Sequence, residues 1–82
     1  MGNDVGRNIR QLRVGRGLTQ QQVADKLYVT RATLSNYENG RRHPNLIIAI
    51  LIADFFQVSL DELAGREQIG QQMVRRTDPN GI

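Results

Sequence analysis

The fold of this chain is decided by residues 20–39, which read QQQVADKLYVTRATLSNYEN. Apolar residues stand three or four positions apart in each half, at Val23 and Leu27 and then at Leu34 and Tyr37. This spacing places one apolar stripe on each of two short helices. The stretch is therefore predicted to form two amphipathic helices joined by a tight turn.

Capping residues mark where both helices begin. Thr19 is suited to cap the first, with Gln22 three residues later to complete a capping box, and Thr30 is suited to cap the second. Only two residues then remain for the turn between them. Helices joined so tightly must cross closely, and Ala24 supplies the small side chain that such a crossing needs.

The outward face of the second helix carries short and largely polar side chains with one arginine, namely Arg31, Ala32, Thr33, Ser35, Asn36 and Asn39. A helix face that is merely solvated more often carries Glu and Lys, which are better helix formers. This face is suited to meet a polar surface, and the grooves of DNA are one such surface.

Together these segments resemble the phage-repressor family of helix-turn-helix regulators, also called Cro-like or xenobiotic-response-element (XRE) regulators. The resemblance covers roughly residues 5–65 and rests on Leu18-Thr19-Gln20, Ala24, Val29-Thr30-Arg31, Leu34-Ser35-Asn36-Tyr37-Glu38-Asn39-Gly40, Pro44 and Val58-Ser59-Leu60-Asp61-Glu62-Leu63. It implies an all-α, compact five-helix DNA-binding domain over residues 1–65, followed by a C-terminal extension over residues 66–82. The chain departs from the family at Tyr28 and Gln57, where glycine is common.

The resemblance also implies how DNA is bound. The second helix of the motif would enter the major groove as a recognition helix, with its base-reading side chains being Arg31, Ala32, Thr33, Ser35 and Asn36. The expected phosphate contacts are Gln20, Thr30, Asn39, Arg41 and Arg42. In this family an arginine near the end of the first helix pairs with the glutamate that ends the recognition helix, and those positions are Arg13 and Glu38 here. The alternative is that both are simply exposed.

Charge is distributed in keeping with a nucleic-acid partner. The net charge is only +3, yet residues 1–45 carry eight basic and three acidic residues, whereas residues 46–65 carry three acidic residues and no basic one. Basic charge is thus concentrated in residues 1–45, which contain the helix-turn-helix motif, as electrostatic binding to DNA requires. A solvated cationic face is the simpler alternative.

A fourth helix is expected over residues 45–56, and it is unusually apolar, since LIIAILIA runs unbroken from 46 to 53. Matched to the family, its core-facing residues would be Leu46, Ala49, Ile50, Ala53 and Phe56. Ile47, Leu51 and Ile48 then form an exposed patch of the kind that marks a partner surface. We expect a homodimer on a palindromic site, with Ile47, Leu51 and Phe55 at the contact, although the C-terminal tail is an alternative cover.

Glycines and capping residues mark the ends of the remaining helices. A first helix from Asp4 to about Arg16 has Gly6 and Gly15 inside it, each weakening it by up to ~1 kcal/mol, and Gly17 as its left-handed stop. Its inward residues are Val5, Ile9 and Leu12. Ser59 to Glu62 forms a capping box that opens a short fifth helix, stopped by Gly65. A further short helix to about Arg76 and a disordered end are expected beyond it.

Several classes of protein are disfavoured by composition. The 82 residues contain no cysteine and a single histidine, His43, so neither a metal site nor a catalytic pair is expected, and we predict no enzyme, cofactor or small-molecule substrate. No stretch resembles a signal peptide or a membrane span, so a cytoplasmic protein is expected. The favoured function is a regulator of transcription, with repression as the expected outcome. The alternative is a protein-interaction module, such as an antitoxin-type regulator that grips a partner through its apolar helix and tail.

Overall fold

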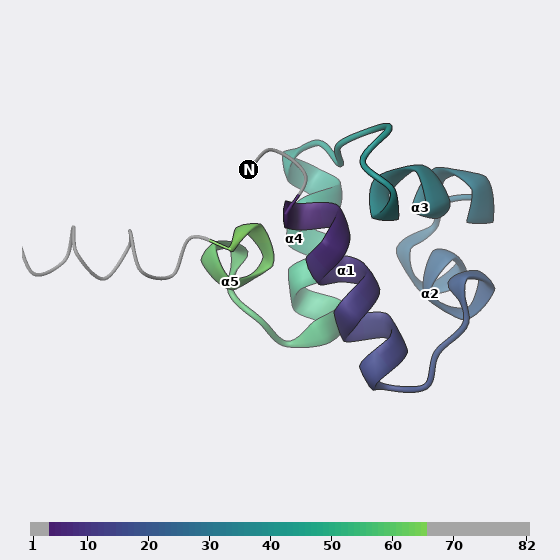
Figure 1. The fold of residues 1–82 in the computed structure, drawn as a ribbon, viewed down its shortest axis with the longest axis horizontal. Helices are drawn as coiled ribbons and strands as arrows, with labels where there is room; N and C mark the ends of the chain where they lie inside the picture. Colours follow the sequence, from purple (N-terminus) through teal and green to yellow (C-terminus); the bar gives the residue numbers. More distant parts are fainter. Residues whose placement is uncertain (1–3, 66–82) are drawn as a thin grey trace, which may run out of the picture.

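The computed structural model describes residues 4–65, and all the regular structure in that range is helical (Figure 1). The helices are α1 (Asp4–Gly15), α2 (Gln20–Leu27), α3 (Arg31–Glu38), α4 (Leu46–Phe56) and α5 (Leu60–Ala64). The predicted all-α fold with five helices is thereby confirmed for this range. The expected helix to Arg76, and the extension over residues 66–82, lie outside the described residues.

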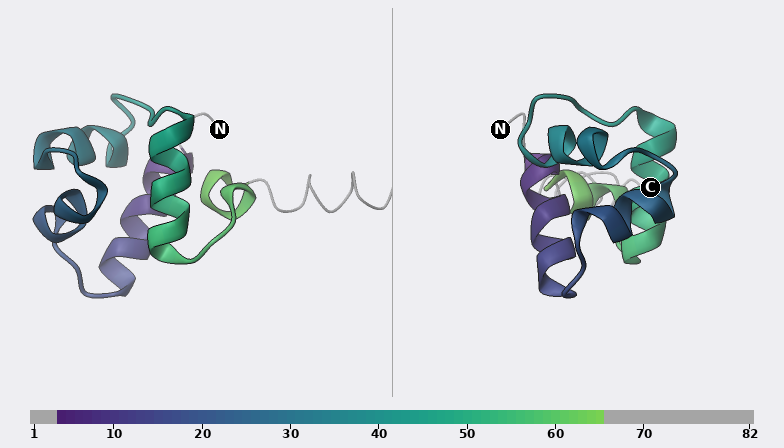
Figure 2. Two further views of the ribbon diagram at one scale, coloured as in Figure 1. Left: turned by 180° about the vertical axis from the view of Figure 1, so that it is seen from behind. Right: turned by 90° about the vertical axis from the view of Figure 1, so that its right-hand side faces the viewer.

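The helices pack around one core. Helices α1 and α4 lie in the middle, with the α2–α3 pair on one side and α5 on the other (Figures 1 and 2). The buried apolar side chains are Ile9, Val23, Ala24, Leu27, Leu34, Tyr37, Ile52, Ala53, Phe56 and Leu63, and they come from every helix. The stripes predicted on the first three helices therefore face the core, with Val5 and Leu12 partly buried at its edge.

The predicted caps are present where local sequence encodes them. Thr19 Oγ1 accepts a hydrogen bond from the Gln22 amide at 3.1 Å, and Gln22 Oε1 accepts one from the Thr19 amide at 2.8 Å, which completes the capping box. Thr30 Oγ1 accepts from the Thr33 amide at 3.1 Å at the start of α3. Asn45 caps α4 rather than beginning it, through a bond of 2.9 Å from the Ile48 amide. Each such cap typically contributes about 1 kcal/mol.

Two helices end in residues that are unusual for their conformation. Tyr28 after α2 and Gln57 after α4 both have φ of 60°, in the left-handed region that glycine adopts most easily. The cost for a residue with a Cβ is about 1–2 kcal/mol each. The Tyr28 side chain is 88% exposed, so it does not cover buried Tyr37. The tight turn is thus built at some cost in stability, with Tyr28 presented to solvent.

Gly6 is where α1 meets the end of α3. A Cβ built on Gly6 would lie 2.1 Å from the carbonyl oxygen of Tyr37 and 3.0 Å from that of Glu38, whereas one on Gly15 would meet nothing within 4 Å. The sequence suggests only that both glycines weaken α1. The structure shows that Gly6 also permits the close approach of α1 to α3.

The expected orientation of α4 is partly wrong. Leu46 and Ile50, expected in the core, are 67% and 40% exposed, while Ile52, not expected there, is fully buried. Ala53 and Phe56 are buried as expected. The reason is that the run is apolar on every side, so its sequence pattern carries no direction and tertiary packing selects the buried face.

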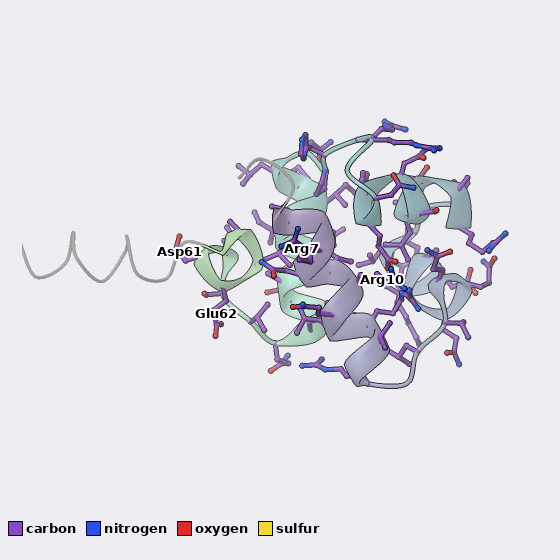
Figure 3. The ribbon with its side chains drawn as sticks, in the orientation of Figure 1. Arg7, Arg10, Asp61 and Glu62 are labelled. Atoms are coloured by element: carbon purple, nitrogen blue, oxygen red, sulfur yellow. The ribbon has the colours of Figure 1, made fainter. Side chains whose placement is uncertain are left out.

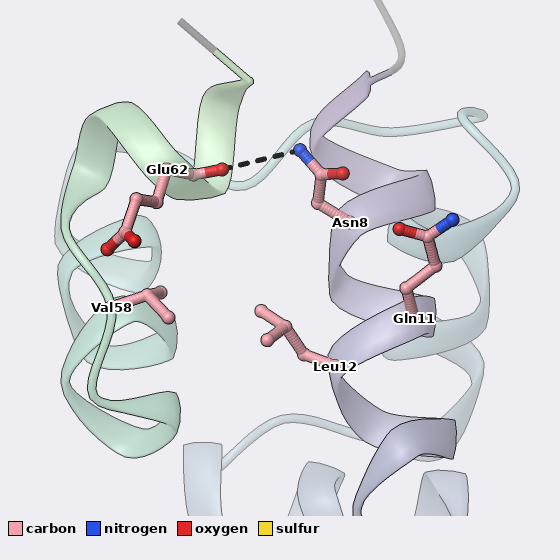
Figure 4. A pocket seen from close by; sticks show the side chains of 5 residues that line it. All are labelled: Asn8, Gln11, Leu12, Val58 and Glu62. Carbon is pink, nitrogen blue, oxygen red and sulfur yellow. Dashed lines mark hydrogen bonds between the residues drawn. The ribbon is translucent and has the colours of Figure 1, made fainter. Parts of the chain in front are cut away.

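Polar bonds fasten α1 to the two C-terminal helices. Arg16 Nη2 donates to the Phe56 carbonyl oxygen at 2.7 Å, and its guanidinium carbon lies 5.1 Å from the centre of the Phe56 ring. Asn8 Nδ2 donates to the Leu63 carbonyl at 2.8 Å and to the Glu62 carbonyl at 3.5 Å, across a groove between α1 and α5 (Figure 4). Both side chains bond carbonyls in the last turns of α4 and α5, and the Glu62 carbonyl also accepts the Gly65 amide at 3.2 Å.

Candidate nucleic-acid interface

Arg13, Glu38 and Gln20 join the first three helices at one point. Arg13 Nε lies 2.6 Å from Glu38 Oε2, and Arg13 Nη2 lies 3.0 Å from Glu38 Oε1. Gln20 Nε2 donates to the same Oε1 at 3.1 Å, and Arg13 Nη1 donates to the Leu18 carbonyl at 2.9 Å. The expected pair is thus present and makes two contacts between the side chains. Gln20 links α2 to the same pair.

This ion pair is largely buried. The side chains of Arg13 and Glu38 are 13% and 5% exposed. The hydrogen bond to Glu38 raises the pKa of Arg13 above its ordinary value, and the negative charge of Glu38 acts in the same direction against the effect of burial. The guanidinium therefore stays charged, and it holds the C-terminal end of α3 against α1.

The outward side of α3 carries the residues expected to read bases. Leu34 and Tyr37 are buried on one side of the helix, Arg31 and Ala32 are exposed on the other, and the half-buried members are Thr33, Ser35 and Asn36. Thr33 Oγ1 accepts a hydrogen bond from Thr30 Oγ1 at 2.9 Å. The Arg31 side chain makes no hydrogen bond or ion pair within residues 4–65, so its guanidinium donors are available to a partner.

The loop after α3 is tied down through its backbone. The amides of Arg41 and Arg42 donate to the Asn36 carbonyl at 2.9 and 3.2 Å, and Asn39 Oδ1 accepts from the Arg41 amide at 3.3 Å. Gly40 supports this turn with φ of 80°. Both arginine side chains remain exposed, so the loop presents two cations beside the C-terminal end of α3.

The residues expected to contact phosphates lie in three places. Gln20 and Asn39 line one polar cleft beside the ion pair, Thr30 lies at the opposite end of α3, and Arg41 and Arg42 lie in the loop. The same cleft is lined by Arg10 of α1, which is not among the expected phosphate contacts.

The residues expected at a dimer contact border one apolar face of α4. Ile47 and Leu51 are 66% and 38% exposed, and the mispredicted Leu46 and Ile50 extend the same face. Phe55 is half-buried at its edge, packed against the core. The left view of Figure 2 has α4 in front, and no described helix covers it. We use the name α4 face for the four exposed residues Leu46, Ile47, Ile50 and Leu51.

An apolar groove continues the α4 face. Its volume is about 350 Å³, and its apolar lining consists of Val5, Pro44, Leu46, Ala49, Leu60, Leu63 and Ala64. His43 lines this groove too. Its side chain is exposed, as are those of Arg41 and Arg42, which precede it in the loop. Leu46 belongs to both the face and the groove, so exposed apolar surface runs from α4 onto α5.

No helix within residues 4–65 has the length and hydropathy needed to cross a membrane. Within the same range, no group of three or more His, Cys, Asp or Glu side chains is arranged to hold a metal ion.

Comparison with known proteins gives consistent matches. The HTH-type transcriptional activator BcrR of Enterococcus faecalis is 43% identical over 61 residues, which is 74% of this chain and 30% of BcrR. The competence pilus inhibition repressor of Acinetobacter baylyi is 37% identical over 60 residues, 73% of this chain and 54% of that protein. The antitoxin PezA of Streptococcus pneumoniae is 32% identical over 65 residues, 79% of this chain and 41% of PezA. The chain thus spans about half or less of each of these relatives.

No solved structure matches the chain significantly. A family model described as helix-turn-helix matches residues 9–63, which include all of α2 through α4 and most of α1 and α5. The chain therefore belongs to the XRE family of helix-turn-helix proteins, the phage-repressor family that its sequence resembles.

Proposed function

We propose that this chain is the sequence-specific DNA-binding part of a transcriptional regulator, and that it reads the major groove of double-stranded DNA with α3. The observation that carries the proposal is the outward side of α3, where an exposed Arg31 has no partner within residues 4–65. The buried Arg13–Glu38 pair fastens the C-terminal end of that helix to α1. A rigid helix with free polar groups along one side is what base reading requires.

Base reading would begin at the N-terminal end of α3. Arg31 can donate two hydrogen bonds to O6 and N7 of guanine, and Ala32 can contact a thymine methyl group. Asn36 can pair with adenine, while the hydroxyls of Thr33 and Ser35 suit more than one base. One helix therefore reads a few successive base pairs of a half-site.

Contacts to the DNA backbone would set the position of α3. Gln20, Thr30 and Asn39 offer neutral donors, and Arg41 and Arg42 add positive charge beside the end of α3. Such contacts supply affinity and register without reading sequence.

The regulator would act as a homodimer on a palindromic site. A two-fold axis would place two α3 helices about 34 Å apart, which is one turn of DNA. The α4 face is the proposed contact, because four large apolar side chains are exposed there and a groove extends the apolar surface. A two-fold contact buries each of them twice. Phe55 borders this contact.

Base reading is tested by comparing Arg31→Ala with Arg41→Ala on a site selected from random duplexes. Arg31→Ala should cost about 1–3 kcal/mol on that site and relax preference at one base position. Arg41→Ala should weaken all duplexes alike and reduce the salt dependence by about one unit. Equal and sequence-independent effects from the two substitutions would exclude Arg31 as a base reader.

A partner-binding regulator is the second candidate, favoured by the exposed α4 face and by the relative named as an antitoxin. Gel filtration with and without a palindromic duplex separates the two candidates, because a protein that only binds a protein partner would elute unchanged. The relatives include a named activator and a named repressor. Repression, the expected outcome, would follow where the bound site overlaps a promoter.

A further inference from the structure

A polar cleft lies where α1, α2 and α3 converge. Its volume is about 300 Å³, and its lining residues are Arg10, Arg13, Gln20, Ser35, Glu38 and Asn39. Gly6 brings α1 against the carbonyls at the end of α3, and Arg10 stands one helical turn further along the same side of α1. The close approach at Gly6 therefore sets the base of Arg10 beside the cleft.

The charges in this cleft do not cancel. Both oxygens of Glu38 are occupied, one by Arg13 alone and the other by Arg13 together with Gln20. Arg13 and Glu38 thus neutralise each other. The Arg10 side chain is exposed and makes no hydrogen bond or ion pair within residues 4–65. The cleft is left with one uncompensated positive charge among neutral donors.

We propose that this cleft binds a phosphate of the DNA backbone and that Arg10 supplies its charge. The inference rests on the proposed function, because Gln20 and Asn39 are expected backbone contacts and both line the cleft. A phosphate there would meet the Arg10 guanidinium, the Asn39 amide and the Ser35 hydroxyl. Guanidinium groups suit phosphate because their planar fork donates two parallel hydrogen bonds. Helix α1 thereby becomes part of the DNA-binding surface.

Arg7 provides a matched control on the same helix. It is exposed, carries the same charge and does not line the cleft. In Figure 3, Arg10 lies on the side of α1 that faces α2 and α3, whereas Arg7 lies nearer α5. Replacing either residue by glutamine removes one positive charge from α1, but only one of the two changes alters the cleft.

The experiment measures affinity for one duplex across a range of salt concentrations, using wild type, Arg10→Gln, Arg7→Gln and Arg10→Lys. Arg10→Gln should reduce the slope of log affinity against log salt by about 0.9, the value for one phosphate contact. When the salt concentration rises fourfold, the fold-loss in affinity of this variant should then be smaller than that of wild type by a factor of roughly 3.5. Arg7→Gln should keep the wild-type slope, and Arg10→Lys should restore most of it.

The outcomes separate this inference from the proposed function. If wild type binds no duplex, the proposed function fails. If wild type binds and Arg10→Gln keeps the full slope, the cleft is not a phosphate site although the function stands. Equal losses of slope in Arg10→Gln and Arg7→Gln would show a general charge effect and overturn the inference as well. Thermal melts verify that each variant is folded.

Discussion

Replacing Gly6 by alanine should destabilise the protein, even though alanine is the better helix former. The new Cβ would lie 2.1 Å from the Tyr37 carbonyl oxygen, and ordinary contact begins at 3.4 Å. The two helices must therefore separate by more than 1 Å at this point. The obstructing atoms belong to backbone and cannot rotate away as a side chain would.

The expected magnitude follows from two opposing effects. Overpacking typically costs about 1–3 kcal/mol, and the gain in helix propensity is about 0.5–1 kcal/mol. Because backbone yields poorly, we expect a net loss of about 2 kcal/mol in the free energy of unfolding. A domain of this size loses about 4–8 °C in melting temperature per kcal/mol, so the melt should fall by roughly 8–16 °C.

Gly15→Ala is the matched control, since a Cβ there would meet nothing within 4 Å. It should stabilise the protein by about 0.5–1 kcal/mol. Urea unfolding followed by circular dichroism measures both variants. A Gly6→Ala protein as stable as wild type would refute the close approach of α1 to α3.

Two other substitutions test the ion pair and the dimer contact. Glu38→Ala should cost about 3–5 kcal/mol, because it leaves the charge of Arg13 largely buried and unpaired, and urea unfolding that gives under about 1 kcal/mol would contradict a buried pair. Ile47→Glu combined with Leu51→Lys should give a folded monomer that keeps its half-site preference, as measured by sedimentation and melts, whereas Val14→Glu, on exposed α1 surface, should stay dimeric. Unfolding of the double variant would place both residues in a core, and an unchanged dimer would place the contact elsewhere.

Features encoded locally could be predicted from the sequence. The caps at Thr19, Thr30 and Ser59 depend on side chains that bond amides three residues away, so spacing alone identifies them. The buried sides of α1, α2 and α3 could also be predicted, because polar residues separate the apolar ones in each helix. The Arg13–Glu38 pair, by contrast, joins residues 25 apart and was expected only from family resemblance.

Features set by tertiary packing could not be predicted. The uniformly apolar run of α4 gives no signal for which side is buried, so it predicts neither the burial of Ile52 nor the exposure of Leu46. Nothing in the sequence distinguishes Gly6 from any other glycine that weakens a helix, because its role depends on the close approach of α3. Arg10 became distinct from its neighbouring arginines only once the cleft was known, although its spacing from Gly6 and Arg13 was a usable signal.

The central claim is that the chain distinguishes one DNA sequence from another. The most direct measurement compares its affinity for a duplex selected from a random pool with its affinity for a scrambled duplex of equal length and composition, at one physiological salt concentration. A sequence-specific reader should prefer the selected duplex by about 1,000-fold or more. Equal affinities for the two duplexes would contradict the account.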